Sequence, residues 1–242
     1  MFAILDHRRF RALNGPSAPT AHNGWVNQRK STATARRTHG VTASERRDHL
    51  VKLAAELFAR KGFQATTVRN IADEAGILSG SLYHHFDSKE SIVDEVLRTF
   101  LDDLTARYRV ILDSGKGPAE VLAQMVRTGF ATLEPHRAAI TVMQNDWNYL
   151  RSLEHHRFDY LVKAEDEIER MWMEQIKKGQ ATGELRADVD PKLTYRMLRD
   201  SIWVAVRWFR PGGRLNTTAL ADHYITVLFD GLATGERTDQ PG

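Results

Sequence analysis

Apolar residues recur at helical spacing through the chain from residue 42 onward, and this periodicity limits the fold more than any other feature. The first segment carries one apolar stripe at positions i, i+3, i+4, i+7 and i+8: Leu50, Leu53, Ala54, Leu57 and Phe58. A strand would need apolar and polar residues to alternate every two positions, and the sequence has no sustained alternation of that kind between turn residues. We therefore predict an all-α fold of about nine helices.

Capping residues and glycines divide this periodicity into separate helices. Thr42 and Glu45 have the spacing of a capping box, and Gly62 is placed to end the first helix. Thr67 is placed to cap a second helix, which Gly76 ends. The other predicted helices cover about 79–85, 88–112, 118–134, 137–149, 154–178, 191–209 and 216–232. Three small helices thus precede a larger bundle.

Basic charge is concentrated before the first helix. Residues 1–40 contain seven Lys or Arg and one acidic residue, whereas the net charge of all 242 residues is only +3. A basic segment without periodicity predicts a disordered tail over 1–41, and we expect a second disordered tail over 236–242. The basic tail is either an unstructured extension, even one that precedes the true start codon, or a source of additional phosphate contacts.

Composition and short motifs exclude several classes of protein. The chain has no cysteine, which excludes a thiol nucleophile and agrees with a reducing cytoplasm. It has no run of about 18 apolar residues, so no membrane association is expected. The adjacent pairs His84-His85 and His155-His156 diverge by about 100° on a helix and make no two-ligand metal face. We expect a cytoplasmic protein that is not an enzyme and that holds no metal or cofactor.

The stretch TTVRNIADEAGILSGSLYHHF, residues 66–86, predicts two short helices joined by a turn at Gly76. Packed on the preceding helix, such a pair forms a helix-turn-helix unit whose second helix lies in the DNA major groove. Small residues begin that second helix and permit a close approach to bases and phosphates. Leu78, Leu82 and Phe86, spaced by four, are expected to face the core. The alternative is a generic three-helix core with a polar outer face.

We therefore predict that residues 42–88 bind DNA. The candidate contacts come from the start of the first helix of the pair, from the second helix and from the start of the helix that follows. They are Thr66, Thr67, Arg69, Ser79, Gly80, Ser81, Tyr83, His84 and Lys89.

The longer stretch TTVRNIADEAGILSGSLYHHFDSKESIVDEVL resembles the N-terminal signature of the TetR family of bacterial transcriptional repressors. HLVKLAAELFARKGFQA before it and GELRADVDP after it are also similar to that family. The resemblance implies a homodimer that binds a palindromic double-stranded DNA operator. It also implies that residues 89–235 form a ligand-binding and dimerisation domain, whose effector changes the separation of the two recognition helices. Leu78 departs from the family pattern of Ser or Thr, so we expect Ser79 to cap the helix one residue later.

In the segment TYRMLRDSIWVAVRWFRPGGRL, Arg199, Trp203 and Arg207 fall at i, i+4 and i+8 on one helix face. Arginine is rarely buried without an anionic partner, so this stripe predicts a cavity wall that meets a large, partly apolar anion. The alternatives are that Arg199 pairs with an acidic residue of a neighbouring helix, or that both arginines border a dimer interface. Other bulky residues that are candidates for the same pocket are Met143, Trp147, Tyr160, Met171 and Trp172, together with Met125 and Phe130.

SIWVAVRWFRPGGRL and ILSGSLYHHFDSKE are similar to a narrower branch, the actinobacterial TetR-type repressors of cholesterol and steroid catabolism that respond to CoA thioesters. This resemblance implies an acyl-CoA effector whose rings contact Trp203 and whose phosphates and carbonyls contact Arg199 and Arg207. A fatty acyl-CoA or a drug is the alternative effector. Two other classes stay open: an α-helical acyl-CoA enzyme that binds through Arg199 and uses a carboxylate such as Glu169 as base, and a sequence-tolerant DNA protein that uses the basic tail.

Overall fold

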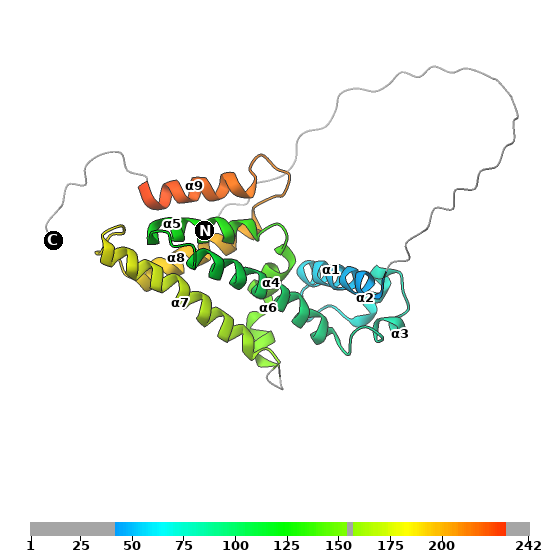
Figure 1. The fold of residues 1–242 in the computed structure, drawn as a ribbon. Helices are drawn as coiled ribbons and strands as arrows, with labels where there is room; N and C mark the ends of the chain where they lie inside the picture. The colour runs from blue at the N-terminus through cyan, green and yellow to red at the C-terminus, as the bar shows by residue number, and fades with distance from the viewer. Residues whose placement is uncertain (1–41, 154–156, 231–242) are drawn as a thin grey trace, which may run out of the picture. The chain divides into compact units, whose positions relative to one another are not determined.

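A computed structural model describes residues 42–153 and 157–230, and these residues form helices without any strand (Figure 1). The first three are α1 (Ala43–Lys61), α2 (Val68–Ala75) and α3 (Ser79–Leu82). They are followed by α4 (Lys89–Leu112), α5 (Pro118–Ala131), α6 (Arg137–Ser152), α7 (Asp159–Thr182), α8 (Pro191–Val204), the 3-10 turn η1 (Ala205–Arg207) and α9 (Thr217–Asp230). The all-α prediction is confirmed. The predicted tails, the helix start at 154 and the pair His155-His156 lie outside the described residues.

The predicted caps of the first two helices are present. The Thr42 hydroxyl accepts a hydrogen bond from the backbone N–H of Glu45 at 3.2 Å, and the Glu45 carboxylate accepts one from the backbone N–H of Thr42 at 2.7 Å. Gly62, with φ of 85°, ends α1. Gly76 ends α2 in the left-handed conformation with φ of 66°, which a residue with a Cβ atom rarely adopts. This glycine makes the tight turn between α2 and α3.

The third helix differs from its prediction in length and in its cap. It ends at Leu82 rather than at residue 85, and tighter i to i+3 hydrogen bonds continue the chain through His84 and His85. Leu78, not Ser79, occupies the N-cap position, and its side chain cannot accept a capping bond. Leu78 is also 81% exposed, so the prediction that it faces the core is wrong. Its extended backbone places it before the helix, off the stripe that buries Leu82 and Phe86.

One long helix, α4, belongs to both halves of the described chain. Near its start Ile92 and Val93 are buried with the core residues of α1–α3, and towards its end Tyr108 contacts Trp172 of α7 edge to face. Arg47 of α1 forms an ion pair with Glu95 of α4. Figure 1 shows α4 running from the three small helices into the layers made by α5, α7, α8 and α9. A movement of the bundle therefore has a direct path to the small helices through α4.

Close packing holds the bundle together. Gly129 of α5 lies against α8, because a Cβ atom at this position would be only 3.1 Å from the Ile202 side chain. Helix α8 ends at Val204 and continues as η1, whereas one uninterrupted helix was predicted over 191–209. Among the described residues, no helix is both long enough and apolar enough to cross a membrane.

Candidate nucleic-acid interface and ligand cavity

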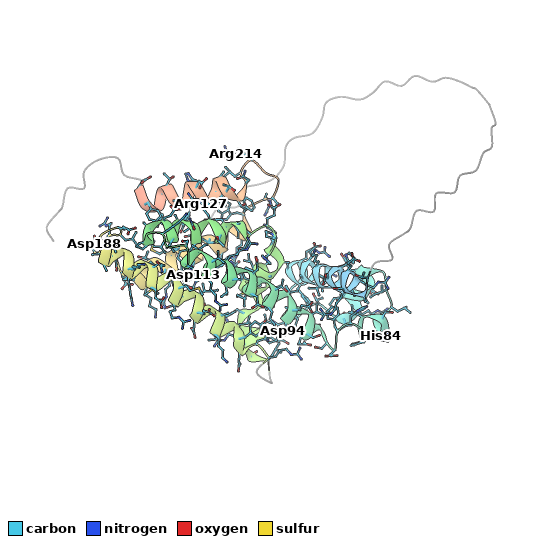
Figure 2. The ribbon with its side chains drawn as sticks, in the orientation of Figure 1. His84, Asp94, Asp113, Arg127, Asp188 and Arg214 are labelled. Atoms are coloured by element: carbon cyan, nitrogen blue, oxygen red, sulfur yellow. The ribbon has the colours of Figure 1, made fainter. Side chains whose placement is uncertain are left out.

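Several of the predicted DNA contacts on and beside α2 and α3 are exposed to solvent. Tyr83 is 56% exposed, and Figure 2 shows His84 projecting from the surface beside α3. Gly80 is exposed, and a Cβ atom added to it would meet no atom within 4 Å. Arg69 is exposed and lies 3.9 Å from Asp73, a separation at which a surface ion pair contributes little. These side chains are available to a ligand that approaches from outside.

Three other predicted DNA contacts are less freely available, because one caps a helix and two are half-buried: Thr67, Ser79 and Ser81. The Thr67 hydroxyl accepts a hydrogen bond from the backbone N–H of Asn70 at 3.1 Å, and the amide oxygen of the Asn70 side chain accepts one from the backbone N–H of Thr67 at the same distance. Thr67 nevertheless remains exposed. Ser79 and Ser81 are half-buried on α3. Cap formation and contact with a phosphate are compatible at Thr67, because the cap uses only the acceptor side of its hydroxyl.

Thr66 is a correction to the predicted set. The residue is completely buried, and its hydroxyl donates to the backbone carbonyl of Gly62 at 2.8 Å. A fully buried hydroxyl with a partner has no route to a DNA phosphate. The sequence placed Thr66 at the open end of a helix, whereas the turn between α1 and α2 folds it inward.

Lys89 is a second correction. Its ammonium group donates to the backbone carbonyls of Phe63, Gln64 and Thr66, at 2.9, 3.3 and 3.0 Å. It also lies 4.5 Å from the centre of the Phe63 ring. An ammonium group has three donors, so these bonds use all of them. Lys89 therefore fixes the turn before α2 instead of offering a free charge to a phosphate.

A cavity of about 420 Å³ lies between α4, α6, α7, α8 and η1. Five of the eight predicted ligand-binding residues line it: Met143, Trp147, Arg199, Trp203 and Arg207. Trp203 contacts Phe100 edge to face, with 5.7 Å between the ring centres. Most of the lining is apolar, and a few polar groups lie among it, which is the usual composition of a small-molecule site.

Arg199 has acidic partners from two directions. Its guanidinium donates to Glu165 of α7 at 3.2 Å and to the neighbouring Asp200 at 2.9 Å. Burial opposes its charged form, but the carboxylates of Asp200 and Glu165, together with Tyr195, outweigh that cost and raise the pKa of Arg199. The pairing with a neighbouring helix and the place in a cavity wall, which the sequence analysis held as alternatives, are therefore both present.

Arg207 is held differently from Arg199. Its side chain donates to the amide oxygen of Gln144 at 3.3 Å, and within residues 42–153 and 157–230 it forms no ion pair with a carboxylate. The residue is exposed at the edge of the cavity. A cation without a carboxylate partner beside an apolar cavity favours an anionic group on the bound molecule.

The other three predicted ligand-binding residues do not line the cavity, and these assignments are corrected. The Tyr160 hydroxyl donates to the backbone carbonyl of Asp94 at 3.3 Å, and the Arg98 guanidinium lies over its ring. Trp172 packs between Tyr108 and Tyr195 in the core, and Met171 is buried beside it. Met125 and Phe130 are likewise core residues of α5. Sequence cannot distinguish a core aromatic residue from a cavity residue when both lie on apolar helix faces.

The cavity is also lined by residues that were not predicted from the sequence. They are Phe100, Leu101, Leu104, Ile140, Gln144, Leu161, Glu165, Ile168, Tyr195, Asp200 and Val204. Burial raises the pKa of the Tyr195 phenol to about 12, so this side chain stays neutral at physiological pH. Among these residues, only Tyr195 could have been predicted from the sequence, because it lies one turn before Arg199 on the same helix face.

The residue that was named as an example of the base in the enzyme alternative lies outside the cavity. Glu169 does not line the cavity, and its carboxylate lies 4.0 Å from the ammonium of Lys192. The carboxylates that do line the cavity, Glu165 and Asp200, are both hydrogen-bonded to Arg199. In the described part of the chain, no group of three His, Asp or Glu is arranged to hold a metal ion.

Two family models match the chain. Residues 50–96 match the model described as bacterial regulatory proteins of the tetR family, and residues 115–232 match the tetracyclin repressor-like C-terminal domain. The first match covers most of α1–α3 and the start of α4, and the second covers α5–α9. The two matches divide the chain where the structure passes from the small helices into the bundle.

Curated relatives and solved structures agree with these models. The chain is 47% identical to the HTH-type transcriptional repressor KstR2 of Rhodococcus jostii, over 79% of this chain and 93% of the relative. It is 45% identical to KstR2 of Mycobacterium tuberculosis, over 78% and 94%. The solved structure of the ketosteroid transcriptional regulator KstR2 of Mycobacterium tuberculosis superimposes with a TM-score of 0.75 at 44% identity, over 81% of this chain and 98% of that one.

Proposed function

Because the chain belongs to the TetR family of bacterial regulatory proteins, we propose that it is a transcriptional repressor that a small-molecule effector releases from operator DNA. Residues 42–88 act as the DNA-binding domain, and residues 89–235 bind the effector and form the homodimer. The protein works in the cytoplasm, where its operator lies. It is a regulator and not an enzyme.

The exposed face of α2 and α3 supports the DNA-binding part of this proposal. Tyr83 and His84 project from the surface, and Gly80 leaves space for a close approach. Ser79 and Ser81 contribute hydroxyl groups, while Arg69 and Thr67 reach the phosphates that flank the groove. In a dimer, two such faces must meet half-sites about one helical turn apart, roughly 34 Å. A small change in their separation therefore costs contacts at both half-sites.

One observation carries the effector part of the proposal: an apolar cavity of about 420 Å³ has Trp203 in its wall and Arg199 and Arg207 beside it. The relatives' name, ketosteroid transcriptional regulator, points to a fused-ring compound of steroid origin. We propose that the rings occupy the cavity against Trp203, and that anionic groups meet the two arginines. A CoA thioester of such a ring acid combines both features in one molecule.

The volume of the cavity suggests which part of this effector lies inside the cavity and which part extends outside it. About 420 Å³ lies in the lower range of small-molecule sites and suits a fused-ring acyl group rather than a whole acyl-CoA. The CoA portion then extends past the exposed residues Val204 and Arg207 at the cavity edge. Arg207, without a carboxylate partner, is the first cation that its phosphates meet.

Fluorescence anisotropy with a labelled duplex from the region upstream of the chain's own gene tests this proposal. The purified protein is titrated onto the duplex, and the complex is then challenged with cholyl-CoA, a thioester of a fused-ring acid. Palmitoyl-CoA, free CoA and cholate are the matched controls. We expect release by cholyl-CoA at concentrations at which the three controls leave the complex intact.

Other outcomes would redirect the proposal. Release by palmitoyl-CoA and not by cholyl-CoA would assign a fatty acyl-CoA as the effector class. Release by cholate and by none of the CoA compounds would show that the effector is a free acid and not a CoA thioester. Equal binding of unrelated duplexes would refute a specific operator and favour the sequence-tolerant alternative.

A further inference from the structure

Helix α6 contains the only charged side chain that is buried among the described residues. Asp146 is 6% exposed, whereas the other buried polar residues of the described chain are threonines. A carboxylate in such a place is costly unless it accepts hydrogen bonds, so its partner has structural importance.

The partner of Asp146 belongs to the turn before the DNA-facing helices. The carboxylate accepts a hydrogen bond from the backbone N–H of Phe63 at 3.2 Å, across 83 residues of sequence. Phe63 is completely buried, and its ring contacts Phe58 of α1 and Tyr149 of α6, with ring centres 5.1 and 6.0 Å apart. Asp146 and Tyr149 are three positions apart on α6, so one face of this helix holds Phe63 by both its backbone and its ring.

The turn that Phe63 begins leads directly to the cap of α2. Lys89 of α4 holds the carbonyls of Phe63, Gln64 and Thr66, and Thr67 then caps α2. The N–H of Phe63 is thus bonded from α6 and its carbonyl from α4. A displacement of either helix changes the position of the residue at which α2 starts.

A second face of α6 lines the ligand cavity. Ile140, Met143, Gln144 and Trp147 follow one another at helical spacing, and all four line the cavity. Arg207 donates to Gln144 on this face. Asp146 and Trp147 are neighbours in sequence, so the contact with the turn and the contact with the cavity are made by adjacent residues of one helix.

We propose that Asp146 is the positioning residue that couples occupation of the cavity to the orientation of the DNA-facing helices. The inference rests on the proposed function and adds the contact through which the effector acts. A ligand that moves the Trp147 face of α6 moves the Asp146 carboxylate with it. Since that carboxylate is bonded to the backbone of Phe63, the turn and the start of α2 shift with the helix.

The test measures coupling rather than binding alone. The operator affinity of each variant is determined by anisotropy with and without saturating cholyl-CoA, and the ratio of the two affinities is the coupling factor. Binding of cholyl-CoA itself is followed by the tryptophan fluorescence of the chain, to which Trp147 and Trp203 of the cavity contribute. The variants are Asp146→Ala, which removes the acceptor, and Asp146→Asn, which keeps one acceptor oxygen without the charge. Asn145→Ala, at an exposed position on the same helix, is the matched control.

We expect the coupling factor to fall at least about tenfold in Asp146→Ala, with cholyl-CoA still bound. Asp146→Asn should recover part of the coupling, because a neutral oxygen accepts a weaker hydrogen bond than a carboxylate does. Asn145→Ala should equal the wild type. If Asp146→Ala does not fold, a coupling factor of Asp146→Asn about threefold or more below that of Asn145→Ala is the supporting result.

Hydrogen exchange gives an independent measurement on the unmodified chain. The Phe63 amide should keep its protection when cholyl-CoA is bound, because its hydrogen bond to Asp146 must persist for the turn to follow α6. The amides of Asn70 and Ile71, which are bonded to Thr67 at the start of α2, should change their exchange rates as that start shifts. Loss of protection at Phe63 when cholyl-CoA binds, or wild-type coupling in both Asp146 variants, would overturn the inference and leave the proposed function intact. If the wild-type protein binds its operator but cholyl-CoA does not release it, both the effector class and the coupling are overturned.

Discussion

The DNA-facing helices and the ligand cavity are built in opposite ways. The surface of α2 and α3 comes from about twenty consecutive residues, and capping bonds and a glycine turn define it locally. The cavity takes its residues from α4, α6, α7, α8 and η1, over more than a hundred positions of sequence. A contiguous site is specified by local chemistry, whereas a dispersed site exists only after the helices have packed.

The same difference explains the two corrections at the DNA-facing end. Thr66 and Lys89 lie at the borders of the contiguous stretch. The Thr66 hydroxyl bonds to Gly62, four positions earlier, and the Lys89 ammonium bonds to carbonyls 23 to 26 positions earlier. The complete burial of Thr66 and the long-range bonds of Lys89 result from packing, which no local pattern reveals. The border of a local site is therefore where predictions from sequence lose accuracy.

The largest expected effect is a loss of stability on substitution of Lys89, and it tests whether this residue stabilises the turn or binds DNA. Replacing Lys89 with Ala removes three hydrogen bonds from an ammonium group to carbonyls, and we expect the free energy of unfolding to fall by about 3 kcal/mol. Urea denaturation followed by circular dichroism measures this change, and Lys52→Ala, at an exposed position of α1, is the control. A variant of unchanged stability that binds operator with a smaller salt dependence would show that Lys89 is a phosphate ligand after all.

The second effect tests the contiguous site itself. Tyr83→Ala should weaken operator binding by about 2 kcal/mol, roughly thirtyfold, because each half-site of the dimer loses a contact. Stability should not change, since Tyr83 is 56% exposed. Anisotropy titrations measure the affinity, and Tyr83→Phe distinguishes the hydroxyl from the ring. Wild-type affinity in Tyr83→Ala would place the DNA contact elsewhere.

The third effect tests the dispersed site. Arg199→Met should leave operator affinity unchanged while raising the cholyl-CoA concentration needed for release about tenfold, because one cation of the cavity wall is lost. Arg196→Met, at an exposed position of the same helix that does not line the cavity, is the matched control. Release of Arg199→Met at wild-type concentrations would mean that Arg199 serves only its pairs with Glu165 and Asp200.

The smallest effect concerns the missing cap of α3. Leu78→Thr supplies a side-chain oxygen at the N-cap position and removes an 81% exposed apolar side chain, so it should stabilise the fold by about 1 kcal/mol. Leu78→Ala removes the apolar side chain without adding a cap and is the comparison. Thermal unfolding measures both variants. Equal melting temperatures for Thr and Ala would show that α3 is held by Leu82 and Phe86 and not by its cap.

Much of the fold could be predicted from the sequence because helices carry their signals locally. The capping box at Thr42 and the glycine ends at Gly62 and Gly76 were all predicted from neighbouring residues. The end of α8 at Val204 was not, because a change from α-helical to 3-10 bonding leaves the apolar pattern almost unchanged.

The cavity could be predicted only in part. Arg199, Trp203 and Arg207 stand out because charged residues interrupt an apolar helix, and they do line the cavity. Tyr160, Met171 and Trp172 offered the same kind of signal as Met143 and Trp147, yet they pack elsewhere. An apolar face indicates burial, but it does not say whether another side chain or a cavity lies opposite.

The sequence by itself determined the helical periodicity, the capped helix pair that presents Tyr83 and His84, and the polar stripe of the helix that carries Arg199. These features depend on residues within one or two turns of each other, so the order of amino acids is sufficient. Only the tertiary structure decided that Lys89 supports a turn, that Glu165 meets Arg199, and that Asp146 holds the backbone of Phe63. Those contacts join residues 23 to 83 positions apart, and they form only when packing of apolar faces brings separate helices together.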